Sequence, residues 1–154
     1  MQSTSGAGGD VDVVWRPESV LRRIEKLREY RRDLRGWKNL AYEQYVKERQ
    51  TRHAAERVLH LATEAILDIL DHVLSSRFDV VSDSYEEIIN NARLHGVVSD
   101  RLGSELSGLG GFRNVLAHDY LGISNEEVFR HLEKMNRIMD TVVAELERLV
   151  EADG

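Results

Sequence analysis

The sequence predicts an all-α protein, an up-and-down bundle of four to five helices, and three observations lead to this fold class. The 154 residues include a single proline, and proline is the residue that most strongly interrupts helices. Apolar residues recur at steps of three and four along most of the chain, as they do on one face of an α-helix. No segment shows a convincing alternation of apolar and polar residues, which would indicate a strand. A chain of this length can bury one proper core, so we expect one domain.

Composition limits the classes of protein that remain. The chain has no cysteine, which excludes a disulfide framework, a thiolate zinc site and a cysteine nucleophile. The formal net charge of −6 argues against broad non-specific binding of nucleic acid, although it is compatible with a locally basic groove. No apolar run approaches the length of a membrane span, and the N-terminus lacks the pattern of a signal peptide. We therefore expect a cytoplasmic protein without a membrane partner.

The first helix is predicted to follow a short tail. Residues 1–12 are rich in serine and glycine and carry no periodic apolar pattern, so we expect a disordered tail before a helical domain over residues 13–154. Proline suits the first position of a helix, so Pro17 marks the expected start, and Gly36 marks the expected end. Opposite the apolar side lies a basic face that includes Arg28, Arg31, Arg32 and Arg35. This face is either a solvated surface with ordinary ion pairs or a track for an RNA backbone.

The longest apolar pattern covers residues 50–76, after a short linking helix around residues 37–46, and we expect it to form the central core helix. Its polar side carries five titratable residues, each four positions apart: Glu56, His60, Glu64, Asp68 and His72. Such a row suggests a metal site. However, positions four apart drift by about 40° per step on an ideal helix, so the five cannot all face one ion. We therefore predict no metal and interpret Glu64 and Asp68 as partly buried polar groups near an active site or as a solvated edge.

Serine residues mark the expected starts of the later helices. Two capping boxes, each a serine followed three residues later by a glutamate, open helices over residues 84–96 and from residue 124 to the end of the chain. Between them, Ser99 or Asp100 caps one helix whose apolar stripe, from Leu102 to Leu116, crosses a glycine-rich stretch and carries the helix up to an arginine and a histidine. Glycines are unfavourable inside helices, so this cluster indicates close packing, a kink or room for a ligand. Its members are Gly103, Gly108, Gly110 and Gly111.

The end of this helix carries the residues that best support a chemical function. Arg113 is followed five residues later by His118, and Tyr120 lies two residues further on. Metal-independent cleavage of RNA needs a base for the 2′-hydroxyl, an acid for the leaving 5′-oxygen and a cation near the phosphorane. Histidine can be the acid or the base, and arginine can be the cation.

The spacing of the motif leaves two interpretations open. On a straight helix a five-residue step turns through about 140°, so Arg113 and His118 converge only where the helix ends or distorts, or across a two-fold axis between two copies. The alternative is that His118 caps a helix C-terminus and Arg113 pairs with an acid.

The string Arg113-x4-His118-x-Tyr120 resembles the Arg-x4-His-x-Tyr signature of HepT-like toxins, which belong to the HEPN superfamily of helical ribonucleases. Residues 52–68 resemble the core helix of that family, and the residues around the motif resemble its active-site stretch. The resemblance implies a HEPN-like helical bundle. It also implies a homodimer in which the two active-site stretches face each other.

The same resemblance implies an activity and a partner. The expected activity is that of a metal-independent endoribonuclease without a cofactor, acting on RNA as the toxin of a type VII HEPN/MNT toxin–antitoxin pair. Arg113 and His118 take the catalytic positions, and Asn114 and Asp119 are supporting residues. The expected partner is a minimal nucleotidyltransferase antitoxin, called MNT or MntA. In such pairs the antitoxin transfers AMP from ATP to the motif tyrosine, which is Tyr120 here.

A second hypothesis comes from a different class of protein. Arg113 and His118 could bind the phosphate of a nucleotide without cleaving RNA, in a non-enzymatic nucleotide-binding or interaction module that partners a nucleotidyltransferase. Tight nucleotide binding without cleavage would favour this alternative.

Overall fold

The computed structural model describes residues 13–118 and 124–151, with the side chain of His118 left out. The predicted tail, residues 1–12, lies outside the described residues, as do Asp119 and Tyr120 of the motif. Over the described ranges the chain forms seven helices and no strand, which confirms the predicted all-α bundle. None of these helices combines the length and the apolarity that crossing a membrane requires.

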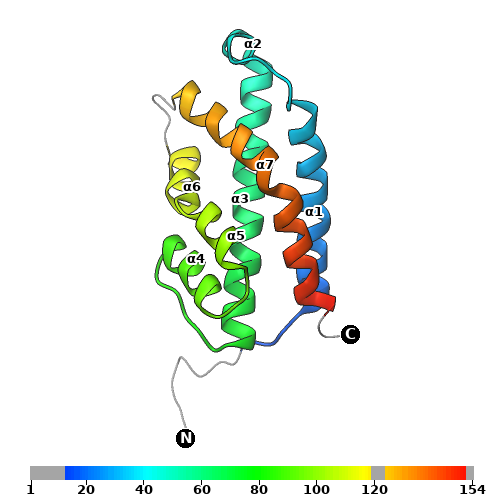
Figure 1. Ribbon diagram of the computed structural model, residues 1–154, viewed down its shortest axis with the longest axis vertical. Helices are drawn as coiled ribbons and strands as arrows, with labels where there is room; N and C mark the ends of the chain where they lie inside the picture. Colours follow the sequence, from blue (N-terminus) through cyan, green and yellow to red (C-terminus); the bar gives the residue numbers. More distant parts are fainter. Residues whose placement is uncertain (1–12, 119–123, 152–154) are drawn as a thin grey trace, which may run out of the picture.

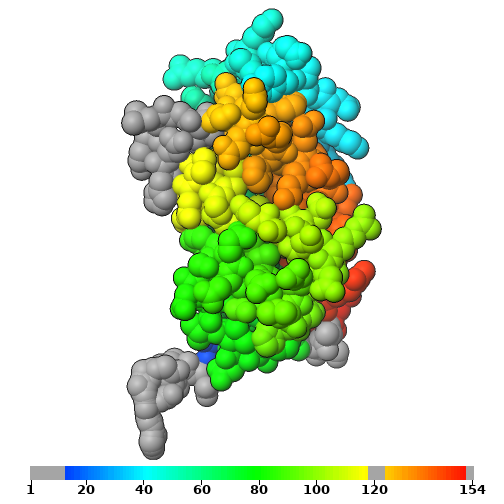
Figure 2. Space-filling view, turned by 60° about the vertical axis from the view of Figure 1, so that its left-hand side comes forward, coloured from blue at the N-terminus to red at the C-terminus, as the bar shows by residue number. Residues whose placement is uncertain are grey.

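Three long helices run along the length of the molecule, three of the shorter helices lie along one side of them, and α2 lies at one end (Figure 1). Helix α3 is central, because it contacts α1, α2, α4, α6 and α7. Helices α4, α5 and α6 follow one another along one face, with the first half of α7 beside them (Figure 2). The helices are α1 (Pro17–Gly36), α2 (Tyr42–Lys47), α3 (Arg49–Arg77), α4 (Tyr85–Leu94), α5 (Asp100–Leu106), α6 (Leu109–His118) and α7 (Asn125–Glu151).

The core is formed by the apolar stripes of these helices. On α3 the buried positions recur at the predicted helical spacing, and they pack against the buried stripes of α1 and α7. Deep in this core lie Leu27 of α1, Leu70 of α3 and Met135 of α7, each with almost no exposed surface. Burial of such side chains contributes about 1.5–3 kcal/mol each, so packing against α3 is the main force that fixes the bundle.

The basic face of α1 packs beside acidic residues of α7. Arg28 forms an ion pair with Glu147, and Asp140 accepts from both Arg31, at 3.3 Å, and Arg35, at 2.6 Å. Exposed pairs of this kind are worth at most about 1 kcal/mol each. The geometry agrees with the interpretation of an ordinary helix face with ion pairs, because three of the four arginines already have acidic partners.

The serine caps form as predicted at all three helix starts. In each case the serine hydroxyl accepts a hydrogen bond from a backbone N–H three residues further on: Ser84 from Glu87 at 3.1 Å, Ser99 from Leu102 at 3.1 Å and Ser124 from Glu127 at 3.3 Å. These bonds satisfy donors that a helix N-terminus leaves free.

The prediction of one continuous helix up to the Arg-His stretch is wrong. Helix α5 ends at Leu106 and α6 begins at Leu109, because Gly108 has a φ of +89°, in the left-handed region that favours glycine. Gly110 has a different role. A Cβ atom at this position would lie 2.4 Å from the Cβ of Tyr85, so α6 packs closely on the start of α4. The glycine cluster therefore provides both a break and a close contact.

Candidate active site

Arg113 lies on α6 and is held by residues from two other helices. Its Nη2 atom is 3.4 Å from Oε1 of Glu64 on α3, and its guanidinium carbon lies 5.1 Å from the ring centre of Tyr85 on α4. The second contact is a cation–π interaction. The Arg113 side chain is 20% exposed, so part of it remains accessible to a ligand. Asn114 is exposed, and its Oδ1 atom is 3.5 Å from Nη1 of Arg113.

Glu64 has a second partner one helical turn earlier on α3. Nε2 of His60 lies 2.5 Å from the same Oε1 atom that faces Arg113, and the His60 side chain is only 19% exposed. Glu64 therefore connects a histidine on one side with the motif arginine on the other. Its position agrees with the prediction of a partly buried polar group near the site.

The row of titratable residues on α3 does not converge on one point. His72, at the far end of the row, accepts a hydrogen bond from the backbone N–H of Arg16 at 3.1 Å and stacks on Trp15. Among the described residues no group of three or more His, Cys, Asp or Glu side chains is arranged to hold a metal ion. The angular drift along an ideal helix explains why the ends of the row have different neighbours.

Asp68 follows Glu64 by one turn and shares its electrostatic surroundings. The side chain is exposed, yet desolvation by the neighbouring protein raises the pKa of Asp68 above its usual value. Arg23 opposes this rise in pKa, as does Arg113 more weakly, whereas the carboxylate of Glu64 adds to it. The motif arginine thus lies within the field of two acidic residues on α3.

Glu86 fixes the N-terminal turn of α6. Its two carboxylate oxygens accept hydrogen bonds from the backbone N–H groups of Gly108, at 3.0 Å, and Gly110, at 3.1 Å. These are donors that a helix start leaves free, and a negative charge at this end is favoured by the helix dipole. This contact could not be predicted from the sequence, because Glu86 looks like an ordinary acidic residue in the first turn of α4.

His131 of α7 holds the next turn of α6. Its ring stacks on the buried Phe112, with 3.4 Å between the ring centres. Burial, together with the nearby charges of Lys134 and Arg130, lowers the pKa of His131 to about 4. The imidazole is therefore neutral at physiological pH, and it packs as an aromatic side chain directly beside the residue that precedes Arg113.

The structure brings Arg113, Glu64 and Tyr85 together from three helices, and it leaves the rest of the motif undefined. His118 is the last residue of α6, and its side chain lies outside the described part of the chain, together with Asp119 and Tyr120. Within α6 the five-residue step from Arg113 to His118 still corresponds to about 140° around the helix.

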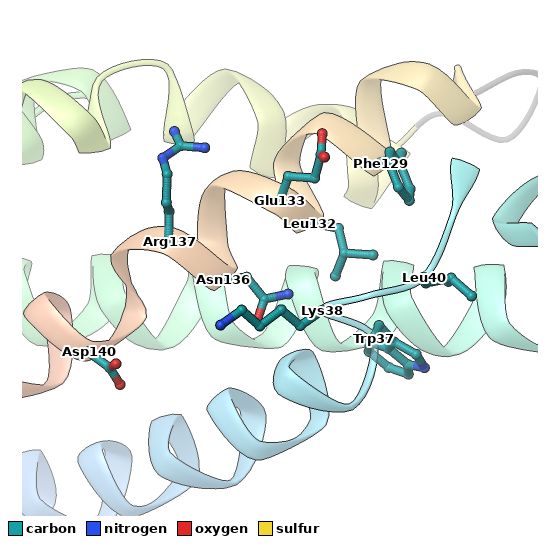
Figure 3. Close-up of a pocket in the computed structure, with 9 residues that line it drawn as sticks. All are labelled: Trp37, Lys38, Leu40, Phe129, Leu132, Glu133, Asn136, Arg137 and Asp140. Atoms are coloured by element: carbon teal, nitrogen blue, oxygen red, sulfur yellow. The ribbon is translucent and has the colours of Figure 1, made fainter. Parts of the chain in front are cut away.

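A cavity of about 500 Å³ lies elsewhere, between the end of α1 and α7 (Figure 3). Aromatic side chains from Trp37 and Phe129 line it together with charged groups from Lys38, Glu133 and Arg137. No residue of α3 or α6 contributes to its lining, so this cavity is separate from the Arg113 cluster.

Helix α6 carries Arg113 and ends at His118, so this helical bundle has the Arg-x4-His spacing that resembles the signature of helical ribonucleases. The family model described as ribonuclease HepT-like matches residues 20–151, and the chain therefore belongs to the ribonuclease HepT-like family.

One relative and two solved structures show what the chain is similar to. The chain is 27% identical over 113 residues to the tRNA nuclease HepT of Aphanizomenon flos-aquae, a match that covers 73% of this chain and 77% of that protein. The fold is similar to that of a tri-AMPylated HEPN toxin from Shewanella oneidensis, solved in complex with an MNT antitoxin, with a TM-score of 0.72 and 14% identity over 84% of this chain and 96% of the toxin. YutE, a cytosolic protein of Bacillus subtilis, gives a TM-score of 0.67 at 22% identity over 89% of this chain and 90% of YutE. At these identities the two structures show the fold alone.

Proposed function

We propose that this chain is a metal-independent endoribonuclease, the toxin of a type VII HEPN/MNT toxin–antitoxin pair, in which Arg113 and His118 are catalytic. The observation that carries the proposal is the geometry of Arg113 in a chain of the ribonuclease HepT-like family. The guanidinium is held by Glu64 and Tyr85 and remains partly exposed, five residues before His118 on the same helix. A fixed, accessible cation is what stabilisation of a phosphorane requires.

The proposed reaction uses two copies of the motif. One His118 takes the proton from the ribose 2′-hydroxyl, and the 2′-oxygen attacks the adjacent phosphorus. The bond from phosphorus to the 5′-oxygen breaks, and the second His118 gives its proton to that oxygen. Arg113 neutralises the charge that develops on the phosphorane oxygens. The products are a 2′,3′-cyclic phosphate and a 5′-hydroxyl.

A homodimer supplies what one copy lacks. On a single helix, Arg113 and His118 diverge by about 140°, and one histidine cannot be both the base and the acid in the same step. Two motif stretches that face each other across a two-fold axis provide two histidines and two arginines around one phosphate. Asn114 and Asp119 are proposed to support this arrangement, Asn114 through its amide oxygen beside Nη1 of Arg113.

Regulation is proposed to occur at Tyr120. In this proposal the antitoxin transfers AMP from ATP to the tyrosine hydroxyl with release of pyrophosphate. The added phosphates would occupy the anion site near Arg113 and His118 and repel an RNA backbone. The similarity to a tri-AMPylated toxin bound to an MNT antitoxin supports this partner. Intact mass after incubation with the antitoxin and ATP tests the site, since Tyr120→Phe should gain no AMP.

The substrate is proposed to be cellular RNA in the cytoplasm, with tRNA as the first candidate because a relative is named a tRNA nuclease. The test is incubation of the unmodified protein with tRNA in the presence of EDTA. We expect cleavage that leaves a 2′,3′-cyclic phosphate. Cleavage that needs an added divalent metal would contradict the mechanism. Tight ATP binding without any cleavage would favour the nucleotide-binding module instead.

A further inference from the structure

We propose that Glu64, whose carboxylate also contacts His60, is a positioning residue for Arg113. The inference rests on the proposed function, and it assigns a role to a residue of α3 that lies outside the Arg-His motif. Oε1 of Glu64 lies between Nε2 of His60, at 2.5 Å, and Nη2 of Arg113, at 3.4 Å. One carboxylate oxygen therefore contacts both side chains.

The orientation of the arginine is restricted from several sides. The carboxylate of Glu64 holds one terminal nitrogen, and the ring of Tyr85 lies against the guanidinium. The Nε atom of Arg113 is buried and has no hydrogen-bond partner among the described residues. A guanidinium has five N–H donors in a rigid fork. Nη2 faces Glu64 and Nη1 faces Asn114, so each terminal nitrogen has one N–H group left to donate to a phosphate.

Glu64 is not needed to dock α6 on the bundle. Leu109 and Phe112 already bury the apolar side of that helix, Glu86 holds its first turn, and His131 stacks on Phe112. The Glu64 side chain is itself 38% exposed, and a partly exposed ion pair adds little to stability because solvent screens it. Loss of Glu64 should therefore change the direction of the guanidinium and leave the fold in place.

The expected effect is on turnover. An arginine that acts mainly on the phosphorane lowers the barrier of the chemical step, whereas contacts along the RNA backbone dominate binding. Displacement of a catalytic group by about 1 Å can cost on the order of a hundredfold in rate. Glu64→Ala should lower kcat about a hundredfold and change KM for RNA less than about threefold. Glu64→Gln keeps the length and one acceptor oxygen, so it should recover roughly tenfold of that loss.

The experiment measures kcat and KM for metal-free tRNA cleavage by the parent and these two variants. Glu29→Gln is the matched control, because Glu29 lies on α1 in an exposed ion pair with Lys26 and has no contact with Arg113. This variant should cleave like the parent. Thermal unfolding of Glu64→Ala should stay close to that of the parent.

A double-variant comparison separates positioning from other roles. In an Arg113→Lys background, which keeps the charge but lacks the planar fork, Glu64→Ala should cost less than about threefold in kcat. If Glu64→Ala lowers kcat equally in the parent and in the Arg113→Lys background, the proposal is overturned, since Glu64 then acts independently of Arg113. Cleavage by Glu64→Gln that is faster than cleavage by the parent would also overturn the proposal. The negative charge of Glu64 would then inhibit Arg113 instead of positioning it. If the parent itself fails to cut RNA, the proposed function fails; if the parent cuts and Glu64→Ala cuts equally well, only the positioning role fails.

Discussion

At the scale of single residues, the candidate site combines one partly exposed cation, Arg113, with side chains from other helices that hold it. Arg113 keeps part of its surface accessible, whereas Phe112 beside it is buried under His131. Phe112 therefore packs α6 against the bundle, and the next residue, Arg113, points to a different side of the helix, where a ligand can reach it. A change in the packing of Phe112 should reach the orientation of Arg113 through the helix.

The neutral His131 makes stability depend on pH. Its pKa is about 4 in the folded protein and 6.5 in an unfolded chain, so the unfolded chain binds a proton first as the pH falls. The free energy of unfolding should decrease as the pH falls from 6.5 towards 4, by roughly 2 kcal/mol between pH 7 and pH 5. His131→Phe keeps an aromatic ring and should lose this part of the pH dependence.

Denaturant unfolding at pH 7 and pH 5 measures the effect. His53→Phe is the matched control, because His53 is exposed on α3. It should retain the acid sensitivity of the parent. If His131→Phe loses as much stability between the two pH values as the parent does, burial of a neutral imidazole is not the cause.

Arg113 and His118 could be predicted as site candidates from the sequence, because cleavage of an RNA phosphodiester needs a cation and a proton-transfer group and their spacing is recognisable. Glu64 could be placed only near a site, since its row of polar neighbours on α3 gave no reason to single it out. Tyr85, Glu86 and His131 carried no local signal. Their roles arise from contacts between helices that are distant in the sequence.

At the scale of elements, α6 is a short helix whose position depends on its first turn. The serine caps made the starts of its neighbours α4, α5 and α7 predictable. The break before α6 was not predictable from periodicity, because the apolar stripe continues at steps of three and four from Leu102 through Leu106 to Leu109. The left-handed backbone of Gly108 changes the direction of the chain without changing that pattern.

Alanine substitutions at two adjacent glycines, Gly110 and Gly111, test how closely α6 packs on α4. Gly110→Ala would place a Cβ 2.4 Å from the Cβ of Tyr85, so it should destabilise the fold by about 1–3 kcal/mol and lower the rate of RNA cleavage. Gly111→Ala is the matched control, because a Cβ there would meet nothing within 4 Å. It should stabilise the helix by about 0.5–1 kcal/mol.

Urea unfolding of the two variants gives the comparison. Equal stability of Gly110→Ala and Gly111→Ala would show that α6 moves away from α4 at no cost, and the close contact would then have no role in holding the site.

At the scale of the whole molecule, one copy of the chain is a helical bundle that carries Arg113 on α6, at one side of α3. Helix α3 connects the two halves of the bundle, since it contacts α1 and α7 on one side and α4 and α6 on the other. The fold class and the family follow from the sequence, because helical periodicity and the family match both extend over most of the chain. The relation between two copies depends on surface complementarity, which periodicity does not encode.

The shared-site mechanism predicts a dimer in solution. Sedimentation at micromolar concentration should show a species of twice the mass of the chain, and dilution that separates the copies should reduce cleavage. A monomer that retains full activity would contradict a site built from two motifs, although the helical frame would be unaffected.

The most direct test of the central claim compares metal-free RNA cleavage by the parent, Arg113→Ala and His118→Ala, using protein whose intact mass shows no added AMP. We expect the parent alone to cut RNA and to leave a 2′,3′-cyclic phosphate. Each alanine variant should retain the helical fold by circular dichroism and lose nearly all activity. Full cleavage by either folded variant would contradict the assignment of Arg113 and His118 as the catalytic pair.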